Sequence, residues 1–133
     1  MVVYDVRTGA VGANLGALAA PVAGMAFSEN GYWLALALAG QSTVEIWDLR
    51  KMAATKTIDV GARVDSVAFD YSGQFLATAG PAGVTVQQNV KDGSARRWIE
   101  PFKSGVAAVA TAWGARAESL VAVGRDGVVK VLA

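Results

Sequence analysis

The residues that could catalyse proton transfer in this sequence are carboxylates, among them Glu45, Asp65 and Asp70. Acid–base catalysis needs two such groups held in one pocket, and no motif places any two of these three together. The sequence has no histidine and no cysteine, which excludes Ser-His triads, histidine bases, thiolate zinc sites and cysteine nucleophiles. We therefore predict a non-enzymatic chain that needs no metal and no cofactor.

Phosphate binding has equally little support. The glycine-rich segment 9–16 matches neither a G-x-G-x-x-G spacing nor a Walker loop, so we interpret it as a connection between strands. Basic pairs lie at 50–51 and 96–97, but 12 Lys and Arg against 11 Asp and Glu give a net charge of only +1. We expect solvated loop charges here rather than direct contact with RNA.

The sequence has 133 residues, of which 53% are hydrophobic and 17% are charged. Such a chain can bury a sizeable core. Its longest apolar stretch, about residues 15–27, contains Pro21 and Gly24 and is shorter than the roughly 18 residues that cross a bilayer. We predict one domain and no membrane span.

An internal repeat organises the chain. Residues 22–35 align with residues 64–77, and three landmark residues recur 42 positions later: Phe27 at Phe69, Gly31 at Gly73 and Leu34 at Leu76. A looser copy places 120–124 over 76–80, and residues 2–7 resemble 44–50. A period near 40 residues is typical of repeat architectures.

Each copy is predicted to consist of short strands. In the first copy they are 22–28, 32–38, 44–49 and 56–60, with a tight turn at Glu29-Asn30-Gly31. The third strand alternates Val44, Ile46 and Asp48 with Glu45, Trp47 and Leu49. The Ala-rich segments 10–24 and 105–118 lack a helical period, so we predict antiparallel sheet throughout.

Four strands in about 42 residues make the blade of a β-propeller. The stretches AFSENGYWLA, STVEIWDLRK and DSVAFDYSGQFLATAG resemble WD40 repeats. Within the WD40 proteins, the combination of AFSENGY, LA and WDLRK resembles the C-terminal propeller of the splicing-associated U-box ubiquitin ligases. The resemblance implies an all-β fold: a partial WD40-type β-propeller of about three blades of antiparallel four-stranded sheet, from a ring of seven.

The expected division of residues 1–133, as one partial propeller, follows the repeats. Residues 2–20 would supply strands c and d of one blade, 21–61 and 62–103 two full blades, and 104–133 a last blade lacking its outer strand. We expect the chain to be part of a longer propeller, with the missing strand supplied from upstream.

The resemblance also implies a function. In that family the ligase activity resides in a U-box, and no U-box-like segment occurs here, so we expect a non-catalytic docking surface for spliceosomal proteins or ubiquitination substrates in the nucleus. The alternative is a WD40 segment of an unrelated scaffold or adaptor. The isolated chain is expected to self-associate through its end blades and to bind the remainder of its own propeller.

The polar network of common WD40 blades is incomplete in this chain. It requires a histidine, which is absent, and a turn aspartate, whose position holds Gln41, Pro81 and then Asp126. The strand-c tryptophan position holds Trp47, Gln87 and then Leu132. We expect these blades to depend on apolar packing, with Trp47 between blades.

The resemblance points to the loops that join strands d to a and b to c as the partner-docking face. Those loops contain Ser42 and Pro81 and the candidate docking residues Gln41, Arg63, Lys103, Arg125 and Asp126. Four apolar residues of the repeat are expected in the core: Phe27, Phe69, Leu34 and Leu76.

Overall fold

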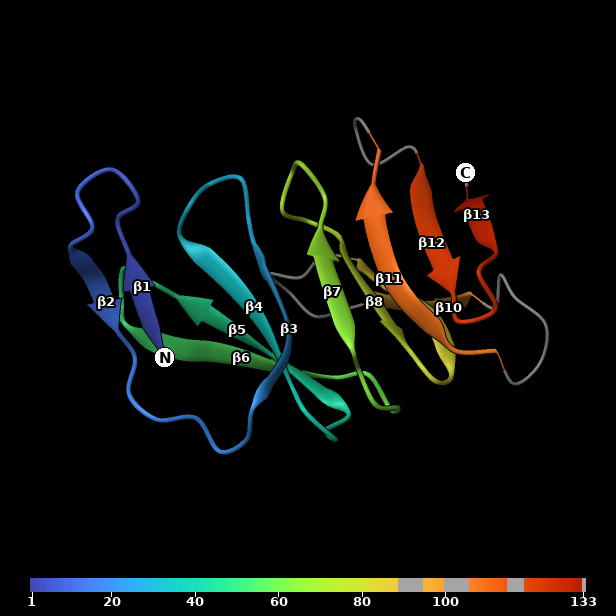
Figure 1. The fold of residues 1–133 in the computed structure, drawn as a ribbon, viewed down its shortest axis with the longest axis horizontal. Coiled ribbons are helices and arrows are strands. Elements are labelled where there is room, and N and C mark those ends of the chain that lie inside the picture. The colour runs from blue at the N-terminus through green and yellow to red at the C-terminus, as the bar shows by residue number, and fades with distance from the viewer. Residues whose placement is uncertain (89–94, 100–105, 115–118, 133) are drawn as a thin grey trace.

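The structure is a computed structural model that describes residues 1–88, 95–99, 106–114 and 119–132. Within these ranges the chain forms thirteen β-strands and no helix. The strands form four sheets that follow one another along the chain, and within each sheet strands consecutive in sequence pair antiparallel (Figure 1). The prediction of strands instead of helices in the Ala-rich segments is confirmed for their described residues.

The sheets have two, four, four and three strands in the described part of the chain. The first contains β1 (Val2–Tyr4) and β2 (Val11–Asn14). The second contains β3 (Val22–Phe27), β4 (Trp33–Leu38), β5 (Thr43–Asp48) and β6 (Ala53–Asp59). The third contains β7 (Ser66–Phe69), β8 (Leu76–Gly80), β9 (Gly83–Gln88) and β10 (Ala95–Ile99). The last contains β11 (Ala108–Trp113), β12 (Leu120–Gly124) and β13 (Val129–Leu132).

The alternation predicted for β5 is confirmed. Val44, Ile46 and Asp48 are only 0%, 3% and 4% exposed, whereas the residues between them are partly exposed. The last strand of this sheet is longer than predicted, since β6 begins at Ala53 instead of residue 56. Part of the glycine-rich segment 9–16 is itself a strand, because Val11–Asn14 forms β2.

The turns that follow β3 and β7 are held by hydrogen bonds to different polar side chains. In the first turn the Asn30 side-chain oxygen accepts hydrogen bonds from the Tyr32 and Trp33 amides at 2.9 and 3.3 Å. In the second, Asp70 accepts one from the Phe75 amide at 2.8 Å. Both turns contain a glycine at positive φ, 73° at Gly31 and 71° at Gly73, which explains why these glycines recur in the repeat.

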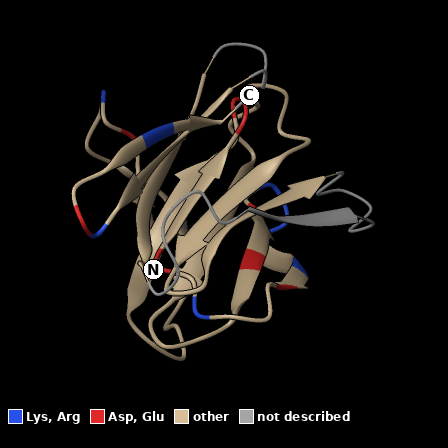
Figure 2. Cartoon of the chain, turned by 90° about the vertical axis from the view of Figure 1, so that its right-hand side faces the viewer, with Lys and Arg blue, Asp and Glu red and all other residues tan. Residues whose placement is uncertain are grey.

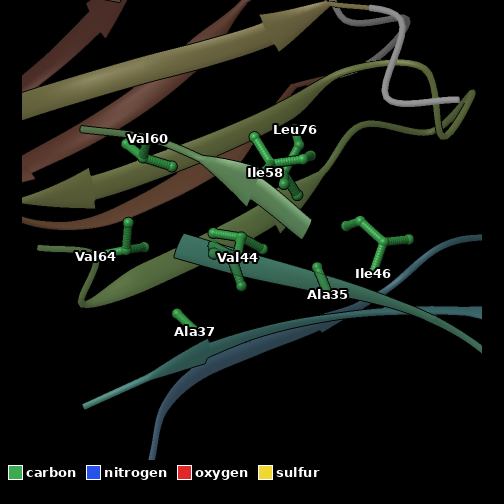
Figure 3. Close-up of a cluster of buried hydrophobic side chains, with 9 residues drawn as sticks. Ala35, Ala37, Val44, Ile46, Ile58, Val60, Val64 and Leu76 are labelled. Carbon is green, nitrogen blue, oxygen red and sulfur yellow. The ribbon is translucent and has the colours of Figure 1, made fainter. Parts of the chain in front are cut away.

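The first buried cluster joins the second and third sheets. From the second sheet and the loop after it come Ala35, Ala37, Val44, Ile46, Ile58, Val60 and Val64, and from the third come Val67 and Leu76 (Figure 3). Apolar side chains of two sheets therefore form one core between them, at roughly 25 cal/mol for each Å² of apolar surface removed from water.

A second cluster joins the third sheet to the last. It contains Ala77, Ala79, Val84, Ala108, Leu120 and Ala122, with Trp113 packed against it. The third sheet thus has a neighbouring sheet on each of its faces. Polar groups are also buried in it, since Thr78 and Thr85 are 3% and 1% exposed and their hydroxyls are hydrogen-bonded to each other.

Three of the four predicted core residues pack inside and one does not. Leu34 and Leu76 are fully buried, and Phe69 is partly buried against the first cluster. The prediction is wrong for Phe27, which is 51% exposed. Phe27 lies at the end of the edge strand β3, on the face opposite Ala26, and only the Ala26 face packs against the first cluster.

The end of β8 lies very close to the segment that enters β7. A Cβ atom added to Gly80 would overlap the backbone carbonyl of Arg63. The Asp65 amide donates a hydrogen bond to the Ala79 carbonyl at 2.8 Å, which fixes this approach. Only glycine fits at this position.

Candidate functional site

The structure brings three of the predicted loop positions together. Gln41 lies in the turn between β4 and β5, and its carbonyl accepts a hydrogen bond from the Val64 amide at 3.2 Å. That bond places Arg63 next to the turn. The close approach of Gly80 to Arg63 brings the β8–β9 turn, with Pro81, to the same place.

Arg63 is the exposed cation of this group. Its Nε and Nη2 atoms lie 3.1 Å from the two carboxylate oxygens of Asp65, and 51% of its side chain is exposed. An exposed pair of this kind adds about 1 kcal/mol or less to stability. A guanidinium has five N–H donors, so Arg63 has donors beyond those used by Asp65.

The other predicted residues lie on the last sheet or outside the described residues. Arg125 and Asp126 are exposed in the turn between β12 and β13. The Arg125 amide donates to the Ala107 carbonyl at 2.9 Å, and the Asp126 carboxylate accepts from the Val128 amide at 3.0 Å. Arg125 and Asp126 therefore belong to the last sheet, whereas Gln41 lies in a turn of the second sheet and Arg63 in the segment that enters the third. Lys103 lies outside the described residues.

The three carboxylates considered for acid–base chemistry have separate partners. Glu45 accepts a hydrogen bond from the Trp47 indole nitrogen at 2.9 Å, and Asp65 pairs with Arg63. Asp70 is 2% exposed and holds its turn through the Ser72 and Phe75 amides and the Ser72 hydroxyl. Each carboxylate therefore has a local structural role.

Asp48, Arg50 and Tyr32 form one connected charged contact. The Arg50 Nε and Nη2 atoms donate to Asp48 at 3.1 and 2.8 Å, and the guanidinium carbon lies 4.5 Å from the centre of the Tyr32 ring. The side-chain hydrogen bond from Arg50 lowers the pKa of Asp48 to about 2, although burial acts in the opposite direction. The same bond raises the pKa of Arg50.

This pair predicts an acid-dependent loss of stability. Because the pKa of Asp48 is lower in the folded protein than the usual 3.8, its ionised form contributes stability above about pH 4 that is lost as the pH falls through about 2. Asp48→Asn is expected to lower the free energy of unfolding near neutral pH and to approach the wild-type value below about pH 2. Urea unfolding at several pH values measures this convergence. A difference that stays constant with pH would contradict it.

The charged residues do not form a single patch in the described part of the chain; they are scattered over the turns and strands (Figure 2). The described residues contain no group of three or more metal-ligating side chains. They also contain no helix long and apolar enough to cross a membrane.

The fold defines the class of protein. The β-propeller domain of Cps50 (Swd1) from Myceliophteria thermophila superposes on 98% of this chain with a TM-score of 0.81 and 17% sequence identity, and 44% of that domain is covered. The chain therefore has the fold of part of a β-propeller, as the repeats predict.

Sequence comparison narrows the resemblance, although no family model matches the chain. The chain resembles pre-mRNA-processing factor 19. It is 42% identical over 81 residues to that protein from Oryza sativa subsp. japonica, covering 59% of this chain. It is 30% identical over 95 residues, 71% of this chain, to the one from Schizosaccharomyces pombe. The chain spans 15% and 19% of the lengths of these two relatives.

Proposed function

We propose that this chain is a non-catalytic protein-docking segment of a splicing-associated protein of the U-box ubiquitin-ligase class that acts in the nucleus. The observation that carries the proposal is the 42% identity over 81 residues to a protein named for pre-mRNA processing. The scaffold suits docking, because three of the four sheets are packed together through apolar clusters and present turns on a rigid base.

The docking face in this proposal is the one with the turns after β4, β8 and β12. Gln41 and Arg63 are held side by side there by the Gln41–Val64 hydrogen bond, and Arg125 and Asp126 lie on the turn of the last sheet. Lys103 remains a candidate from the sequence. A partner that offers carboxylates to the two arginines would match this face in charge.

A charge-reversal variant tests the docking face. The double variant Arg63→Glu, Arg125→Glu is expected to recover about tenfold less of the splicing proteins from nuclear extract, because it replaces two attractive contacts with repulsive ones. Quantitative mass spectrometry of the proteins that co-purify with wild type and variant measures this.

Arg7→Glu is the matched control, because the Arg7 side chain is 88% exposed and lies between β1 and β2. Its recovery is expected to equal that of wild type. Equal recovery by the double variant would reject the docking face. A wild-type chain that captures no splicing proteins, or the proteins of a transport or cytoskeletal scaffold, would reject the proposed function itself.

A further inference from the structure

A groove of about 600 Å³ lies at the end of the molecule opposite the proposed docking face. Strands β3, β7 and β11 end at this groove, whereas β4, β8 and β12 run antiparallel to them and end at the docking face. In Figure 1 the turns that follow β3 and β7 lie at the top and those that follow β4 and β8 at the bottom. The groove is therefore a second surface.

Aromatic side chains supply the walls of the groove. Phe27, Phe69 and Trp113 come from the ends of the three strands, and Tyr71 follows β7. Phe27 is 51% exposed and Tyr71 is 73% exposed. Neither ring packs in the core, and neighbouring exposed rings of this size are typical of binding surfaces.

The tryptophan of the groove is held in a fixed orientation. Its indole nitrogen donates to the Ala68 carbonyl at 2.9 Å, and its ring lies against Phe75 with the ring centres 6.0 Å apart. The only side-chain donor of Trp113 is thus already used, so its side chain offers ring surface to a ligand.

Both charged residues in the described lining of the groove are acidic. Glu29 and Asp70 line it together with the aromatic rings, and none of the described lining residues is Lys or Arg. Glu29 is exposed, and Asp70 is fixed by its turn. Aromatic faces next to carboxylates attract cations, because the negative ring face and the carboxylate act on the same charge.

The chain already contains one example of this chemistry. Arg50 lies over the Tyr32 ring at 4.5 Å and pairs with Asp48 at 2.8 Å. A guanidinium is planar and weakly hydrated, so it can stack on a ring while it donates to a carboxylate, which an ammonium group does less well. Among the described lining residues of the groove, the rings and Glu29 have no Lys or Arg beside them, so they are suited to an arginine from a partner.

We propose that this groove binds an arginine side chain presented by a segment of a partner protein. The guanidinium stacks on the aromatic walls and pairs with Glu29. This surface is independent of the one that contains Arg63, since the two differ in position and in charge.

The proposal is tested by titrating the isotope-labelled protein with a short Gly-Ser peptide that contains one central arginine. Amide and indole signals of Tyr71, Trp113 and Gly114 are expected to shift. The same peptide with citrulline, which is neutral and nearly isosteric, is expected to bind about tenfold more weakly, and a lysine peptide is expected to fall between them. Equal shifts with arginine and citrulline, or shifts confined to the turns with Gln41 and Asp126, would overturn the proposal.

Exposed residues of the groove provide variants that leave the core intact. Tyr71→Ala and Glu29→Gln are each expected to weaken binding of the arginine peptide about two- to fivefold. Tyr4→Ala is the matched control, because Tyr4 is 60% exposed on β1, away from the groove, and its affinity is expected to equal that of wild type. Unchanged affinity in both groove variants, with wild-type spectra elsewhere, would also overturn the proposal. Binding of the arginine peptide does not depend on whether the Arg63 and Arg125 variant loses splicing partners. The groove proposal and the proposed function can therefore be rejected independently.

Discussion

Replacement of Gly80 by alanine is expected to lower the free energy of unfolding by about 3 kcal/mol or more, the upper part of the range for overpacking. The added methyl group would overlap the Arg63 carbonyl, which is backbone and cannot rotate away. Relief would require β8 to move, although it pairs with β7 on one side and β9 on the other. Urea unfolding followed by circular dichroism measures the change.

Gly12→Ala is the control for this variant. Gly12 is also a strand glycine without positive φ, and its added Cβ would lie 3.6 Å from the nearest atom, the Val3 carbonyl oxygen, an ordinary contact distance. A change of less than about 1 kcal/mol is expected, because alanine also lowers the entropy of the unfolded chain. Similar unfolding midpoints for the two variants would show that the approach of Arg63 to β8 does not matter.

Leu76→Ala is expected to destabilise the protein by about 2–5 kcal/mol. Leu76 is fully buried in the first cluster, where it packs with residues of the second sheet. Truncation leaves a cavity between two sheets, so contacts within a sheet and between sheets are lost together. The variant is expected to unfold at a lower temperature than wild type, whichever spectroscopic signal is used to follow thermal unfolding.

Val6→Ala controls for truncation of an apolar side chain, because Val6 is 96% exposed. Its stability is expected to lie within about 0.5 kcal/mol of wild type. If Leu76→Ala behaved like Val6→Ala, the first cluster would not be what holds the second and third sheets together.

The strands could be predicted from the sequence because period-2 patterning acts over a few residues. The alternation in β5 predicts the buried face that contains Val44, Ile46 and Asp48. The turns are marked by Gly31 and Gly73, because glycine readily adopts the positive φ found there. The N-terminal end of β6 was less predictable, since Ala53 and Ala54 are small and exposed and the pattern there has no apolar period.

The candidate sites were harder to predict, because they depend on which turns meet in space. Repeat alignment gave the loop positions of Gln41 and Arg63, but the two loops meet through a backbone hydrogen bond from the Val64 amide to the Gln41 carbonyl, which no side-chain pattern encodes. Phe27 and Phe69 are equivalent in the repeat and differ in exposure, because burial is set by the neighbouring sheet and not by the residue. For the same reason the aromatic groove had no signal in the sequence beyond the aromatic residues at the strand ends.

Consecutive residues of β8 belong to different cores, since Leu76 is part of the first cluster and Ala77 part of the second. A shift of this strand by one position would put a leucine into the space of an alanine on one face and an alanine into the space of a leucine on the other. A single shift would therefore cause overpacking in one core and a cavity in the other. Insertions and deletions of a single residue in β8 should therefore be removed by selection during evolution, whereas length changes in the exposed turn at 81–82 meet no such barrier.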